Sequence, residues 1–168
     1  MNTDMLIVNI IVISLVFVPY LILILIGQKE TRKISKRFQQ EAKNHQLNIS
    51  EMESWNLNYI GIDTSSQKLL FTQRRDTEFF VDLIDLKSFQ EVKLVTQFEE
   101  IVNNKVKEDI LLKINLEFVG HYNHINHNLC LYDYDLNRDQ DYEMKHAEKW
   151  AKRVSDSLSM PVGFKRVA

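Results

Sequence analysis

Cysteine, proline and glycine are scarce in this chain, and each shortage excludes a class of structure. The 168 residues include one Cys, two Pro and four Gly. A single cysteine, Cys130, permits no disulfide within the chain, as is usual for proteins of reducing compartments. Four glycines leave little material for the Gly-rich loops that bind phosphate groups. No G-x-S-x-G, H-E-x-x-H or paired-carboxylate pattern is present, so the sequence indicates no enzyme class and no cofactor.

An excess of positive charge is also missing. The formal net charge is −2, and because many of the cations gather in one short segment, the remainder of the chain is more acidic still. Proteins that bind phosphate backbones present a basic surface. The charge balance therefore argues against a nucleic-acid partner.

Residues 6–27 contain no charged side chain at all. A helix of that length would reach roughly 33 Å, enough for a hydrocarbon core of about 30 Å. A cleaved signal peptide fits less well, because residues 1–5 lack Lys and Arg, the apolar run is too long, and no A-x-A site follows it. The sequence predicts a transmembrane helix over residues 6–27, with residues 1–5 as an extracytoplasmic N-terminus.

A basic cluster follows the apolar run within ten positions. Positive charge is retained on the cytoplasmic side of membranes, so the cluster predicts a single-pass protein of the inner (cytoplasmic) membrane, with its N-terminus out and its C-terminal domain cytoplasmic. The same side chains are candidates for binding anionic lipid headgroups, although a topology signal alone would explain them. The cluster consists of Lys29, Arg32, Lys33, Lys36 and Arg37.

Residues 28–46 are rich in good helix formers. Ile34, Phe38 and Ala42 recur every fourth position and form a thin apolar stripe. We predict a basic juxtamembrane helical stalk here. Residues 47–55 are predicted as a short connector, in which Ser50 and Glu53 have capping-box spacing for one helical turn.

The pattern changes to short β-rich runs after residue 57. Polar turns separate the runs at residues 57–63, 68–73, 79–85 and 89–97, and two further strands are predicted at 110–119 and 128–135. An amphipathic helix ending before Pro161 closes the pattern, with Trp150 on its apolar face. We predict one α+β domain over residues 47–160, an antiparallel meander or small barrel of about six strands capped by this C-terminal helix, followed by a tail at 161–168.

This order of elements resembles the pleckstrin-homology-like fold. The segments ISEMESWNLNYIGIDTSSQKLLF and VDLIDLKSFQEVKLV, with the Trp-bearing last helix, are also similar to a group of small uncharacterised bacterial single-pass membrane proteins. The resemblance covers roughly residues 47–158 and brings no catalytic motif with it. It implies seven strands where the pattern shows six, unless another strand lies in Phe98–Val102.

Three histidines and the cysteine recur at every third position: His121, His124, His127 and Cys130. Imidazole and thiolate are ligands that zinc favours, and four of them would complete a tetrahedral site. A spacing of three, however, places successive side chains on opposite faces of a strand, and it diverges around a helix. Only an irregular loop would bring all four together. The simpler interpretation is a polar hairpin, with Cys130 as a small buried residue on the returning strand.

Two hypotheses for function follow, from different classes. The first is a membrane-anchored, non-enzymatic adaptor or accessory subunit that presents a cytoplasmic pleckstrin-like domain, by a groove or a sheet edge, to a protein partner or a larger membrane assembly. The alternative is a metal-binding sensor or enzyme that uses the His121, His124, His127 and Cys130 cluster.

Overall fold

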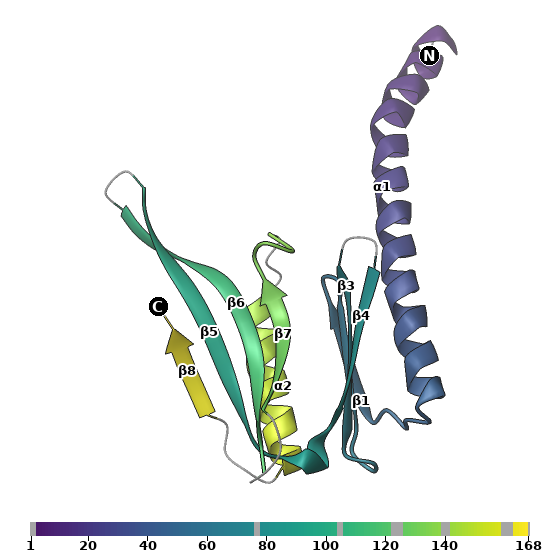
Figure 1. Ribbon diagram of the computed structural model, residues 1–168. Coiled ribbons are helices and arrows are strands. Elements are labelled where there is room, and N and C mark those ends of the chain that lie inside the picture. Colours follow the sequence, from purple (N-terminus) through teal and green to yellow (C-terminus); the bar gives the residue numbers. More distant parts are fainter. Residues whose placement is uncertain are drawn as a thin grey trace.

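The described part of the chain contains two four-stranded sheets and two α-helices, so its class is α+β (Figure 1). This computed structural model describes residues 3–75, 78–103, 106–121, 126–138, 142–158 and 163–167. Within them, the side chains of residues 3–10, 23–30, 102–103, 106 and 163–167 are not described.

The first sheet is an antiparallel meander in the order β1-β2-β3-β4. Its register is set by short turns, because Trp55 pairs with Asn58 across the first of them and Asp63 with Lys68 across the second. In the described part of the chain β1 pairs only with β2, so β1 forms an edge of the sheet. The strands are β1 (Glu51–Trp55), β2 (Asn58–Asp63), β3 (Lys68–Arg75) and β4 (Glu78–Asp85).

The second sheet has the order β7-β6-β5-β8. The 3-10 helix η1 (Leu86–Ser88) leads into it from β4. Strands β5, β6 and β7 are antiparallel, whereas β8 runs parallel to β5. The strands are β5 (Phe89–Asn103), β6 (Val106–Gly120), β7 (His127–Asp133) and β8 (Gly163–Val167).

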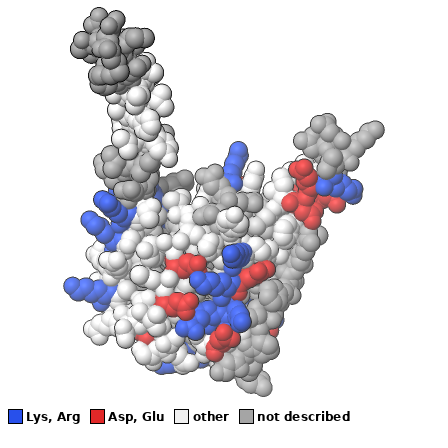
Figure 2. All heavy atoms as spheres, turned by 180° about the vertical axis from the view of Figure 1, so that it is seen from behind, with Lys and Arg blue, Asp and Glu red and all other residues white. Residues whose placement is uncertain are grey.

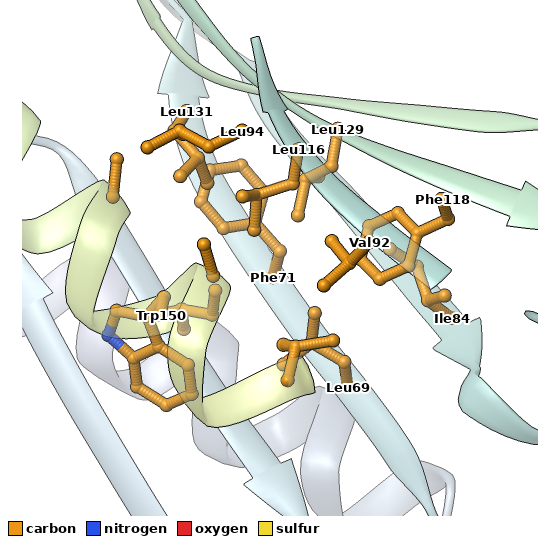
Figure 3. Close-up of a cluster of buried hydrophobic side chains, with 14 of the residues drawn as sticks. Leu69, Phe71, Ile84, Val92, Leu94, Leu116, Phe118, Leu129, Leu131 and Trp150 are labelled. Carbon is orange, nitrogen blue, oxygen red and sulfur yellow. The ribbon is translucent and has the colours of Figure 1, made fainter. Parts of the chain in front are cut away.

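The main core lies between the two sheets, and helix α2 (Glu143–Leu158) contributes to it (Figure 1). Ala147, Trp150 and Val154 of α2 are fully buried, as the helical spacing of these apolar residues predicts. Figure 3 shows Trp150 in one cluster with side chains from both sheets, among them Phe71 of β3 and Leu116 of β6. Both sheets therefore bury an apolar face against the same helix.

Helix α1 (Thr3–Asn44) packs its last turns on the other face of the first sheet. Ile34 and Phe38 are buried there, and the Phe38 ring lies 5.0 Å from the ring of Tyr59. A Cβ on Gly61 would come within 2.6 Å of Phe38 Cζ and 3.0 Å of Ile49 Cγ2. A glycine in the middle of β2 therefore allows the close approach of helix and sheet.

The predicted transmembrane helix is wrong. Residues 6–27 are helical as part of α1, but no helix in the described part of the chain is long and apolar enough to cross a membrane. The prediction of a single-pass protein of the inner membrane, with the N-terminus out and a cytoplasmic domain, is corrected with it.

The predicted strand pattern also needs correction. The described residues form seven antiparallel strands rather than about six, and an eighth, parallel strand follows α2. The missed antiparallel strand is β1, which replaces the expected helical turn, whereas Phe98–Val102 is the far half of β5. The final helix packs between two sheets instead of capping a single small barrel. The physical reason is that both sheets leave an apolar face exposed unless α2 covers it.

Candidate functional site

The described members of the histidine and cysteine series, His121, His127 and Cys130, do not form a metal site with one another. His127 and Cys130 lie on opposite faces of β7, with His127 against Phe89 and Phe118 and the Cys130 thiol directed to the Tyr132 carbonyl oxygen at 3.4 Å. His121 is exposed beyond the end of β6. His124 lies outside the described residues. In the residues that the structure describes, no group of three or more His, Cys, Asp or Glu side chains is placed to hold a metal ion.

His127 and Cys130 each have a structural role instead. A His127 ring nitrogen lies 2.7 Å from a carboxylate oxygen of Asp82, which links β7 to β4 of the other sheet. Burial raises the pKa of the Cys130 thiol above its ordinary value, with Asp133 adding to the effect. A thiol that is held protonated is a poor metal ligand and a poor nucleophile.

The basic cluster divides between two sides of α1. Arg32 and Lys36 are exposed, whereas Arg37 is half-buried and pairs with Glu41 at 2.8 Å. Lys33 is exposed as well, and the side chain of Lys29 lies outside the described residues. The four described side chains thus do not form one common surface, and the predicted role of the cluster in lipid binding stays a prediction.

An open groove lies between the end of α1 and strand β1, and we call it the α1–β1 groove. Its volume is about 720 Å³. Met52, which is 56% exposed, and Ile49 contribute apolar surface on the β1 side. The complete lining is Phe38, Gln39, Ala42, Lys43, Gln46, Leu47, Ile49 and Met52.

The groove opens beside the outer edge of β1, which has no pairing strand among the described residues. Two residues, Asn56 and Leu57, form the loop of the β1–β2 hairpin, and Asn56 adopts a positive φ of 46°, which asparagine tolerates. In such a hairpin the flanking residues form a hydrogen-bonded pair, and bonding alternates along the strand. The N–H groups of Met52 and Ser54 therefore face away from β2. These groups are available to another extended segment.

A carboxylate network holds β1 in place from its other face. Glu53 accepts hydrogen bonds from Trp150 Nε1 at 2.7 Å and from Lys149 Nζ at 3.0 Å, and its other oxygen lies 3.1 Å from His146 Nδ1. Burial alone would raise the pKa of Glu53, but the hydrogen bonds from Lys149 and Trp150 outweigh it and lower that pKa. Glu53 is therefore kept ionised and fixed against α2.

The end of β1 is fixed to α2 in a similar way. The Trp55 ring stacks on His146, with centroids 4.9 Å apart and planes 9° from parallel. Glu143 accepts hydrogen bonds from Trp55 Nε1 and from the Asn56 side-chain amide. Glu51 at the start of the strand pairs with Arg153 at 2.7 Å. The polar side chains on this face of β1 are thus bound to α2, which leaves the opposite face and the free edge toward the groove.

Asp63 fixes the connector that closes one end of the groove. One of its oxygens accepts the backbone N–H of Asn48 at 2.8 Å, and the other accepts the Ser65 hydroxyl at 2.6 Å and the Ser66 N–H at 3.1 Å. The Ser65 hydroxyl contributes most to lowering the pKa of Asp63 well below its ordinary range, against the opposing effect of burial. The connector is therefore held by an ionised carboxylate.

A second pocket, of about 260 Å³, lies at the β6–β7 end of the second sheet and is lined by polar residues such as Glu99 and Asp135. Lys113 already donates to Asp133 there at 3.0 Å, and this hydrogen bond raises the pKa of Lys113. The one cation among its described lining residues, Lys113, is thus already paired with Asp133, and the pocket is much smaller than the α1–β1 groove, so it is a weaker candidate.

The residues of the groove were missed by the sequence analysis because residues 47–55 were assigned to a connector. Two signals pointed to it. Gly61 stands alone in a β-rich run, a position that indicates close approach of another backbone or side chain. The stripe of Ile34, Phe38 and Ala42 needs an apolar surface to pack on, and a sheet face can supply one.

Comparisons with family models, with curated proteins and with solved structures find no match to this chain. The resemblance to pleckstrin-homology-like domains and to small bacterial membrane proteins therefore stays a prediction.

Proposed function

We propose that this chain is a non-enzymatic protein-binding module, an adaptor that takes up an extended segment of a partner protein in the α1–β1 groove. The observation that carries the proposal is the coincidence of an unpaired strand edge with an apolar groove beside it. An added strand obtains affinity from main-chain hydrogen bonds to the edge and specificity from pockets that receive alternate side chains.

The rigidity of β1 supports the proposal. An edge strand that receives another strand gains most when it is already ordered, because ordering it during binding would cost conformational entropy. Glu51, Glu53 and Trp55 are all bound to α2, so β1 is ordered without a partner. Natural sheets often protect their edges with charges or proline. The outward side chains here are Met52 and Ser54, which give no such protection.

Selection of peptides tests the proposal directly. Random seven-residue peptides displayed on phage are selected on the full chain, and the enriched peptides are synthesised and titrated by fluorescence polarisation. Ser54→Pro removes the outward N–H at an edge position where proline is tolerated. Met52→Glu places a charge on the apolar floor of the groove. Thermal melts check that each variant remains folded. If one of the two variants does not fold, the other alone still tests the proposal.

Ile101 provides the matched control, since it is also an exposed apolar strand residue, 40% exposed, and does not line the groove. We expect at least tenfold weaker binding to Ser54→Pro and Met52→Glu, and unchanged binding to Ile101→Glu. Enriched peptides that bind all three variants as tightly as the original chain would refute the proposal, as would a failure to enrich any peptide.

A further inference from the structure

A row of cations on one face of α1 ends at the α1–β1 groove, where Lys43 lines it. Arg32, Lys36 and Lys43 are all exposed, and with Gln39 they stand at positions i, i+4, i+7 and i+11, the spacing of one helix face. Gln39 and Lys43 line the groove, so the whole row lies on the side of α1 that faces it. Figure 2 shows blue side chains projecting from the lower part of this helix. We call Arg32, Lys36 and Lys43 the basic row.

The acidic residues near the groove are directed elsewhere. Glu41 is the one acidic residue of 31–46, and it pairs with Arg37 on the opposite flank of α1. Glu51 and Glu53 belong to β1 but point to α2, where Glu51 pairs with Arg153. The groove is therefore a locally cationic surface in a chain whose net charge is −2. Such a surface attracts an acidic ligand.

The basic row and the edge strand also match in length. From Arg32 to Lys43 the helix rises about 17 Å at 1.5 Å per residue. The five residues of β1 extend about 17 Å at 3.3 Å per residue. The helix runs alongside the strands of the first sheet (Figure 1). An added strand of about five residues is therefore long enough to extend along the basic row while it pairs with β1.

We infer that the segment bound in the α1–β1 groove is acidic: about five residues of a partner protein in extended conformation, with an apolar side chain over Met52 and Asp or Glu side chains toward the basic row. This inference rests on the proposed function and specifies the chemistry of the partner. Main-chain pairing supplies little discrimination between sequences, so the charges select the partner and speed its association.

The test compares peptide selection on charge variants of the full chain. Random seven-residue peptides are selected on the original chain and on the triple variant Arg32→Glu, Lys36→Glu, Lys43→Glu. The control variant Lys87→Glu, Lys145→Glu, Lys152→Glu makes the same change in net charge at exposed positions on η1 and α2 that do not line the groove. The best acidic peptide and its Glu→Gln and Asp→Asn counterpart are then titrated.

We expect Asp and Glu to be enriched on the original chain and on the control, and Lys and Arg to be enriched on the basic-row variant. The acidic peptide should bind the basic-row variant at least tenfold more weakly and the control within twofold of the original chain. It should also lose affinity as salt is raised.

Three results would overturn the inference. Peptides that depend on Ser54 and Met52 but show no acidic preference would leave the proposed function intact and remove the acidic partner. If no selected peptide depends on the groove, both claims are lost. Phosphatidylglycerol vesicles that lose affinity for the basic-row variant, while acidic peptides bind it unchanged, would assign the row to a lipid surface instead.

Discussion

Replacing Phe38 with alanine should loosen α1 from the first sheet and remove one wall of the groove. The ring is 1% exposed, lies 5.0 Å from the Tyr59 ring and covers Gly61, where no Cβ would fit. A Phe→Ala change at a buried site costs about 3–5 kcal/mol, because it removes apolar contact and leaves a cavity. For a chain of this length that corresponds to a fall in melting temperature of about 6–20 °C.

Urea unfolding measures the effect, followed by the fluorescence of Trp55 and Trp150, both of which are buried in the folded chain. Phe17→Ala is the matched control, since Phe17 is an identical side chain on the same helix but is 59% exposed. We expect the free energy of unfolding of the Phe17 variant to lie within about 0.5 kcal/mol of that of the original chain. The Phe38 variant should unfold at much lower urea, with a similar dependence of the free energy of unfolding on urea.

A decrease of less than about 1 kcal/mol in the free energy of unfolding for Phe38→Ala would refute the reasoning, because removal of a buried aromatic ring from a helix–sheet interface destabilises a protein by more than this. Equal losses for Phe38→Ala and Phe17→Ala would refute it as well. Either result would mean that the end of α1 is not part of the packed domain, and the groove would lose its wall.

Three further predictions concern polar groups. Asp63→Asn should lower the free energy of unfolding by about 1–2 kcal/mol at pH 7, because it weakens charge-assisted hydrogen bonds. Since the pKa of Asp63 is lowered in the folded chain, the difference in the free energy of unfolding between variant and original chain should shrink as pH falls below about 4. Urea unfolding at several pH values would show this. Glu53→Gln should lower the free energy of unfolding by about 1.5–3 kcal/mol near neutral pH, since it weakens the hydrogen bonds from Lys149 and Trp150. This loss should also decline in acid, because the pKa of Glu53 is lowered in the folded chain. A constant loss from pH 7 to 3 would contradict the prediction. Cys130 should react with iodoacetamide at pH 7 at least tenfold more slowly in the folded chain than in urea, as mass spectrometry would show, because burial raises the pKa of its thiol.

Periodic apolar patterns predicted most of the elements of this fold. The face of Ala147, Trp150 and Val154 was recognised because three- and four-residue spacing leaves little alternative to an amphipathic helix. Alternation also located β5 and β6, although each extends further than its apolar residues suggest. The arrangement of two sheets around α2 was not predictable, since spacing shows that a face is buried but not what covers it.

Strand β1 was missed for a physical reason. Its inward face carries Glu51 and Glu53, which look like surface residues in the sequence. Their partial burial depends on ion pairs with cationic side chains about one hundred positions later in the chain. A local pattern contains no trace of such partners. The same holds for the groove, because it requires α1 and β1 to be placed side by side, and that placement depends on Phe38 meeting Gly61.

His127 and Cys130 of the metal hypothesis illustrate the opposite case, in which local geometry predicted their separation. A spacing of three along a strand separates successive side chains to opposite faces. His127 and Cys130 lie on opposite faces of β7 for this reason, and His127 is bound to Asp82. The sequence therefore contained the argument against convergence of these two residues.

Amide hydrogen exchange on the free and peptide-bound chain tests the central claim, that a partner segment pairs with the edge of β1. We predict that the N–H groups of Met52 and Ser54 exchange at least tenfold more slowly when a selected peptide is bound, while amides on the free edges of β4 and β7 are unchanged. Bound peptide with no added protection in β1, or with protection at β4 or β7 instead, would contradict the account.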